Sequence, residues 1–174
     1  MHIRRVVTGQ RGDGRSVFVS DQQVEPVAIS GLEFHRIWGS DSLVQLPTDG
    51  SAAPPRLYFP PAGGFRFAFF SLPPASAPPP PGSVIPEMQA KLPGLADVLE
   101  PDHPGMHTTD TVDFDIVISG EVWLELDDGA EVRLQPGDCV VQNGTRHAWR
   151  NKSDQPCLIA VALVGAQRAP ARAS

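Results

Sequence analysis

Two histidines and one aspartate are the residues whose types could support chemistry together. His107 opens the segment HTTDTVDFDIVISG, which also contains Asp113, and His147 lies in the segment NGTRHAWRN. Two imidazoles and one carboxylate on one face of a coordination sphere bind Fe(II), and the same donors suit Zn, Mn or Ni. Such a site leaves positions open for water and substrate, so that the metal could polarise a carbonyl or activate water.

The spacing of the first segment is compatible with one face of a β-strand. Alternate residues of a strand share a face, and His107, Thr109 and Asp113 have the same parity. We expect Thr109 to be an accessory oxygen ligand or to hold a bound water. Asp113 is expected to be a metal ligand or a general base, with the cap of a turn as its structural alternative. The predicted catalytic and metal-binding residues are therefore His107, Asp113 and His147.

Two further side chains are candidates for a substrate pocket beside this site. Trp149 has the same parity as His147, so its ring could stack on a planar substrate, or it could pack in the core. Gln142 could place an amide at the mouth of the pocket.

The elements that must position these residues are short β-strands. From His107 onward, runs rich in β-branched residues are separated by the turn signals SG, DDG, PGD and NG. Strands at this spacing indicate an all-β sandwich or barrel. One short helix is predicted in IPEMQAKLPGLADVLE, where Pro86 suits a helix start and Pro93 with Gly94 would break it.

Residues 1–84 are predicted to form a β-rich extension with a proline-rich connector. The runs VVT and SVFVS are joined by GQRGDG and predict a hairpin, and FRFAFFSL is the clearest strand. The run PPASAPPPPG cannot form a helix or a central strand. We expect this extension to pack on a barrel core of residues 85–174 within one structural domain.

The segment PGDCVVQNGTRHAWRN resembles the second sequence motif of the cupin superfamily. Gly137, Gly144, His147 and Asn151 stand at the motif positions, and Gln142 replaces the usual proline. The turn comes one residue early, whereas the spacing of the histidine and asparagine after Gly144 is that of the family.

The first cupin motif is matched less completely. His107 corresponds to its first histidine and Gly120 to its closing glycine. Thr109 stands in place of the second histidine, and Asp113 in place of the glutamate.

The resemblance implies a cupin double-stranded β-helix, a jelly-roll-like barrel, with an N-terminal β extension and one short helix. It also implies a metal-dependent oxidoreductase or lyase, of oxygenase, decarboxylase or dehydratase type, for a small carbonyl-bearing, cyclic or aromatic (polyketide-like) substrate. The divalent metal would be Fe, Zn, Mn or Ni, or there would be none. The alternative is a non-catalytic sensor or carrier whose metal-free pocket binds a small ligand.

Charge and composition restrict the partners. The net charge of −6 argues against nucleic acid and anionic membranes, which need a basic surface. No apolar run reaches the ~20 residues that span a bilayer. The first residues lack the apolar core of a signal peptide, so we expect a cytoplasmic protein. The N-terminal strands exceed what one small barrel needs, which predicts a homodimer formed by strand exchange or sheet extension.

Overall fold

The chain folds mainly into β-strands. The computed structural model describes residues 2–51, 55–79 and 82–169. Its strands are β1 (Ile3–Gln10), β2 (Ser16–Val24), β3 (Val27–Ile29), β4 (Leu32–Ser40), β5 (Phe65–Leu72), β6 (Thr111–Ser119), β7 (Val122–Glu125), β8 (Glu131–Leu134), β9 (Cys139–Gln142), β10 (Ala148–Arg150) and β11 (Cys157–Gly165). The helical elements are α1 (Ile85–Lys91) and the short 3₁₀ turns η1 (Ala96–Val98) and η2 (Asp127–Gly129).

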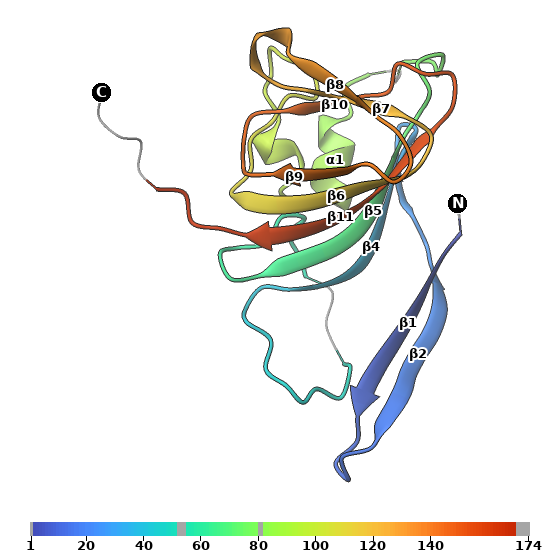
Figure 1. Cartoon of the computed structure of the whole chain (residues 1–174), viewed down its shortest axis with the longest axis vertical. Coiled ribbons are helices and arrows are strands. Elements are labelled where there is room, and N and C mark those ends of the chain that lie inside the picture. Colours follow the sequence, from blue (N-terminus) through green and yellow to red (C-terminus); the bar gives the residue numbers. More distant parts are fainter. Residues whose placement is uncertain (1, 52–54, 80–81, 170–174) are drawn as a thin grey trace.

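Two sheets lie one over the other. The larger sheet has the strand order β3-β4-β5-β11-β6-β9, and the smaller has the order β10-β7-β8. Figure 1 shows the smaller sheet above the larger one, while the separate β1–β2 hairpin projects away from both. This arrangement confirms the predicted all-β cupin barrel with one short helix, and the pairing of β1 with β2 confirms the predicted hairpin.

Strand β11 is the centre of the larger sheet. Its sequence CLIAVALVG is an uninterrupted apolar run, which suits a strand that is covered on both edges and largely buried. It pairs with β5 on one side and with β6 on the other. The pairing with β5 joins the predicted extension, residues 1–84, to the predicted barrel core, residues 85–174, in one sheet; the boundary at residue 84 stays a prediction.

Strand β6 has an unusual polarity. Thr111, Asp113 and Asp115 face the interior and are buried, whereas Phe114 and Ile116 face outward and are exposed. Buried carboxylates are uncommon because the loss of water destabilises their charged form. The alternation therefore directs two acidic side chains into the space between the sheets.

Helix α1 begins and ends where proline allows it. Pro86 lies in its first turn, where a missing backbone N–H is harmless, and the helix stops before Pro93. Met88 and Leu92 are buried and belong to the apolar cluster that covers β4 and β11. The helix thus closes one side of the barrel interior.

The outer face of the larger sheet is apolar. Its exposed apolar side chains come from β5, β6, β9 and β11: Phe67, Phe114, Ile116, Ile118, Val141 and Val164. The predicted homodimer stays a prediction. Within the described ranges, no helix combines the length and apolar character needed to cross a membrane.

The turn after β6 generates a stability prediction. Gly120 has φ +75°, and a Cβ there would lie 2.3 Å from the backbone oxygen of Pro156. Gly137 has φ +93° with nothing within 4 Å of such a Cβ. We expect Gly137→Ala to lower the free energy of unfolding by about 1–2 kcal/mol, the cost of a left-handed alanine. Gly120→Ala should cost more, because the backbone must also move. Urea denaturation measures both, and equal losses would contradict the contact.

Candidate functional site

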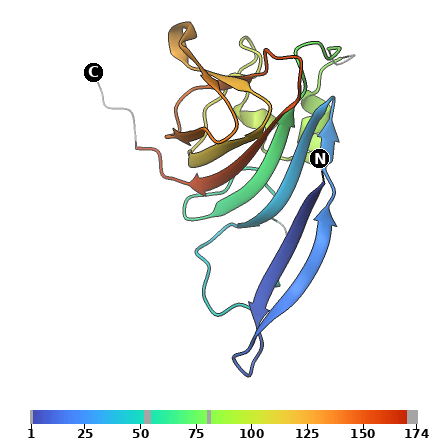
Figure 2. The same cartoon turned by 45° about the vertical axis from the view of Figure 1, so that its right-hand side comes forward.

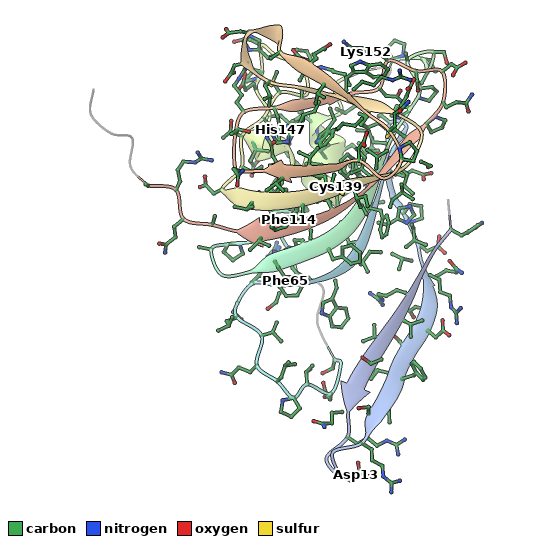
Figure 3. The ribbon with its side chains drawn as sticks, viewed as in Figure 1. Asp13, Phe65, Phe114, Cys139, His147 and Lys152 are labelled. Atoms are coloured by element: carbon green, nitrogen blue, oxygen red, sulfur yellow. The ribbon has the colours of Figure 1, made fainter. Side chains whose placement is uncertain are left out.

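Two backbone hydrogen bonds hold the predicted histidines side by side. The amide of His107 donates to the carbonyl of His147 at 2.9 Å, and the amide of His147 donates back at 3.0 Å. The bridge joins the segment before β6 to the segment before β10. The two imidazole rings consequently lie 4.2 Å apart between centroids, tilted by 49°. Figure 3 places His147 in the space between the sheets.

The hydrogen bonds of both histidines show which ring nitrogen carries the hydrogen. Nδ1 of His107 lies 3.0 Å from the carbonyl oxygen of Gly105, and Nδ1 of His147 lies 2.9 Å from that of Thr145. A carbonyl only accepts, so each Nδ1 carries the hydrogen of a neutral ring. Each Nε2 is therefore the nitrogen with the lone pair, available to accept a proton or a hydrogen bond.

The surroundings keep both rings neutral. Burial lowers the pKa of His107. Burial and the adjacent His107 lower the pKa of His147 to about 4. Two imidazolium ions at this separation would repel each other in a poorly solvated site. Both rings are consequently bases, not cations, at neutral pH.

Two carboxyl groups from β6 enter the same interior. Asp113 Oδ1 and Asp115 Oδ2 are buried, and neither has a hydrogen-bond partner within the described part of the chain. Burial raises the pKa of Asp113 to about 6, against the opposing effect of a hydrogen bond with Thr111. Burial, with the charge of Asp113, raises the pKa of Asp115 to about 8. Asp115 therefore holds its proton to higher pH than Asp113 does.

A cavity of about 250 Å³ brings these four side chains together. His107, His147, Asp113 and Asp115 all line it. Its other walls are mainly apolar and include Phe34, Phe59, Phe70, Leu99, Trp149 and Val161. A mostly apolar cavity with a few converging polar groups is the usual form of a small-molecule site, and this volume suits a small ring.

Trp149 lies in the wall of the cavity. Its ring meets His147 edge-on, with centroids 6.2 Å apart and an interplanar angle of 90°. It also contacts Phe70 at 6.1 Å. The indole thus fixes one side of the His147 ring while presenting an apolar surface to the cavity.

Gln142 and Thr109 are buried but do not line the cavity. The Gln142 amide donates to the hydroxyl of Thr145 at 2.7 Å and to its carbonyl at 3.1 Å. That carbonyl also faces Nδ1 of His147, so Gln142 supports the turn that positions the histidine. The hydroxyl of Thr109 accepts a hydrogen bond from Thr111 at 2.8 Å.

The donor geometry does not supply the predicted three-ligand metal site. The structure brings His107, His147 and Asp113 to one cavity. Among the residues that it describes, however, no group of three or more histidine, cysteine, aspartate or glutamate side chains is arranged to hold a metal ion. Metal binding by these three residues stays a prediction.

Two residues of the site were not predicted. Asp115 follows Asp113 by two positions in VDFDIVIS, so strand alternation was the signal that could have found it. Tyr58 is buried in the cavity wall, and its pKa is raised by burial and by the charges of Asp113 and Asp115. It lies between β4 and β5, and no motif marks it.

Comparison with known proteins identifies part of the chain. The family described as Cupin domain matches residues 98–163. Oryzines biosynthesis cluster protein J of Aspergillus oryzae is 48% identical over 67 residues, which cover 36% of this chain and 37% of that protein. Phomopsin biosynthesis cluster protein D of Diaporthe leptostromiformis is 39% identical over 74 residues, which cover 42% and 38%. The match thus spans less than two fifths of either curated relative.

A solved structure covers more of the chain at lower identity. The Schizosaccharomyces pombe Cnp3 cupin domain aligns with 94% of this chain over 87% of its own length. The sequence identity is 9% and the TM-score is 0.48.

The raised pKa of Asp115 predicts a pH-dependent effect of its replacement. Because the folded protein holds this proton more tightly than the unfolded chain, the ionisation of Asp115 costs no stability below about pH 4, where both states are protonated. The cost grows as the pH rises to about 8. Asp115→Asn should therefore raise the melting temperature, relative to the wild type, more at pH 8.5 than at pH 4.

The exposed Asp154 offers a matched control. Asp154→Asn should shift the melting temperature by a similar small amount at both pH values. Differential scanning calorimetry across this range measures all three proteins, and parallel curves for wild type and Asp115→Asn would contradict the assignment.

Proposed function

The chain belongs to the cupin superfamily, and from that premise we propose that it is an enzyme performing acid–base chemistry on a small carbonyl compound inside its barrel. The observation that carries the proposal is that one cavity is lined by both a protonated carboxyl group and neutral imidazoles. A carboxylic acid with a pKa of about 8 faces the same space as two neutral imidazoles. Environments that separate acid from base in this way are typical of proton-transfer sites.

Asp115 is the proposed acid. Its protonated carboxyl would donate a hydrogen bond to the substrate's carbonyl oxygen, where negative charge develops as the neighbouring C–H bond breaks. Burial, together with the charge of Asp113, keeps the pKa of Asp115 high and so maintains its proton at neutral pH. The unpartnered Asp115 oxygen is consistent with a hydrogen-bond partner supplied by substrate.

His107 is the proposed base. Its Nε2 would take the proton from the carbon beside the carbonyl. The electron pair of the broken C–H bond would form the C=C bond of an enol, and the enol oxygen would take the proton of Asp115. With a hydroxyl on the next carbon, the carbonyl then re-forms and returns that proton. The C–O bond breaks, and the imidazolium protonates the leaving hydroxyl, which departs as water. This sequence is a dehydration, the lyase chemistry among the predicted reaction types.

The cavity supports a small cyclic or aromatic substrate. Its volume of about 250 Å³ and its aromatic walls suit one ring with few substituents. These two curated relatives are named after biosynthesis clusters, one for oryzines and one for phomopsin. We therefore propose an intermediate of secondary metabolism as the substrate of this chain.

A second candidate function is the binding of a small ligand without turnover. The apolar walls, including Phe70 and Trp149, would hold a ring, and Asp115 would donate one hydrogen bond to it. A sensor or carrier needs no more than this. The two functions differ in whether a bound carbonyl compound loses protons.

Proton exchange of a simple ketone tests the catalytic proposal. Wild-type protein should accelerate exchange of the α-protons of cyclohexanone in D₂O, followed by NMR. His107→Gln should reduce the rate by roughly 10²-fold or more, as expected for loss of a general base. The rate should fall above about pH 8, where Asp115 loses its proton, and Asp115→Asn should lack this decline.

His103 provides the matched control, because it is exposed and does not line the cavity. His103→Gln should exchange protons at the wild-type rate. Saturable binding of cyclohexanone with no exchange above the buffer rate would sink the catalytic proposal and favour the ligand-binding protein.

Removal of metal tests the earlier prediction of a metal site. Since the proposed steps use only protein side chains, dialysis against EDTA should leave the exchange rate unchanged. Elemental analysis before and after dialysis accompanies the assay. A rate that falls on dialysis and returns with Fe(II), Zn, Mn or Ni would instead support metal ligation by His107, Asp113 and His147.

A further inference from the structure

A second and larger cavity lies between the β1–β2 hairpin and the larger sheet. Its volume is about 610 Å³, and it is lined by residues of β1, β2, β4, β5 and β11 and of the segment between β4 and β5. Figure 2 shows the hairpin projecting from the side of the molecule where β4 lies. Three arginines line this cavity: Arg5, Arg36 and Arg66.

Arg66 is fixed deep in the wall. Only 4% of its surface is exposed. Its guanidinium donates to the carbonyls of Ser40 at 2.8 Å, Phe65 at 2.9 Å and Leu57 at 3.2 Å, and it pairs with Asp41. An arginine with this many backbone partners is held rigidly, so its positive charge is a permanent feature of the cavity.

Arg5 and Arg36 are the other two arginines that line the cavity. Arg5 donates to the carbonyl of Ile37 at 3.1 Å and lies over the ring of Trp38 at 5.9 Å. Its Nε is buried, with no hydrogen-bond partner in the described part of the chain. Arg36 donates to the carbonyl of Pro55, and burial together with Arg66 lowers its pKa.

The positive charge is poorly balanced within the cavity. None of the described residues that line it is an aspartate or a glutamate, and Asp41, which pairs with Arg66, lies outside the lining. Asp41 offsets one of the three charges, and the excess positive charge destabilises the fold because partly buried cations lose water. A bound anion would remove this cost.

We propose that this cavity binds a small organic oxyanion, a carboxylate or a phosphate ester. The planar guanidinium matches either group with two parallel hydrogen bonds, and both Arg5 and Arg36 line the cavity. The cavity is too large for a bare ion, and Trp38 and Tyr58 give its walls aromatic surface for an organic body. The proposal does not rest on acid–base catalysis at Asp115 and His107.

Calorimetric titration with matched probes tests the site. Benzoate and phenyl phosphate carry the two candidate anions on the same ring, and benzyl alcohol carries none. At constant ionic strength, wild-type protein should bind at least one anion saturably and bind benzyl alcohol at least about tenfold more weakly, the loss expected without charge-assisted hydrogen bonds. The anion that binds more tightly identifies the ligand class.

Variants locate the binding. Arg5→Gln and Arg36→Gln should each weaken it at least tenfold, whereas Arg11→Gln, an exposed arginine in the turn of the same hairpin, should bind like the wild type. Arg66 is left unchanged because it supports the fold. If Arg36→Gln does not fold, Arg5→Lys, which keeps the charge but lacks Nε, should still bind more weakly than Arg11→Gln. Absent binding by the wild type, equal affinity for benzyl alcohol, or equal affinity in all variants would overturn the proposal.

Discussion

The pair of backbone hydrogen bonds between His107 and His147 is the interaction on which the inner site depends. It ties the chain just before β6, in the larger sheet, to the chain just before β10, in the smaller one. The side chains follow from this bridge, because the Nδ1 atoms meet carbonyls of their own segments, at Gly105 and Thr145. This bridge between two distant segments of the chain thus fixes the distance between them and the orientation of the two rings. The carbonyls beside it fix which nitrogen of each ring carries the lone pair.

The inverted polarity of β6 carries a cost in stability, because it places carboxyl groups in the interior that the histidine bridge closes. A strand with apolar residues outside and carboxyl groups inside would be unstable as an isolated element. Here β6 pairs with β11 on one edge and with β9 on the other, so its backbone hydrogen bonds do not depend on its side chains. Burial without a partner disfavours the charged form of each carboxyl group, which is why the pKa values of Asp113 and Asp115 are raised and not lowered.

Much of this architecture could be predicted from the sequence, since strands, turns and helix boundaries follow from local patterns. The apolar run of β11 and the prolines around α1 are examples. Alternation also groups Asp113 with Asp115, but it does not say which face is inside. The arginine cavity was beyond prediction: a register shift lies between Arg36 and Trp38 in β4, and Arg5 arrives from a separate hairpin. Tertiary packing brings these residues together from separate elements, and it produces no repeating pattern of residue types in the sequence.

Tyr58 connects the electrostatics of the two cavities. It lines both, and its phenol is influenced by Asp113 and Asp115 on one side and by Arg36 on the other. Burial and the two aspartates raise its pKa, so the hydroxyl keeps its proton at physiological pH and adds no charge. The barrel therefore holds protonatable carboxyl groups and fixed guanidinium charges on opposite sides of a neutral wall. A negative charge beside Arg36 would favour the protonated form of Asp115, the form on which the proposed carbonyl chemistry depends.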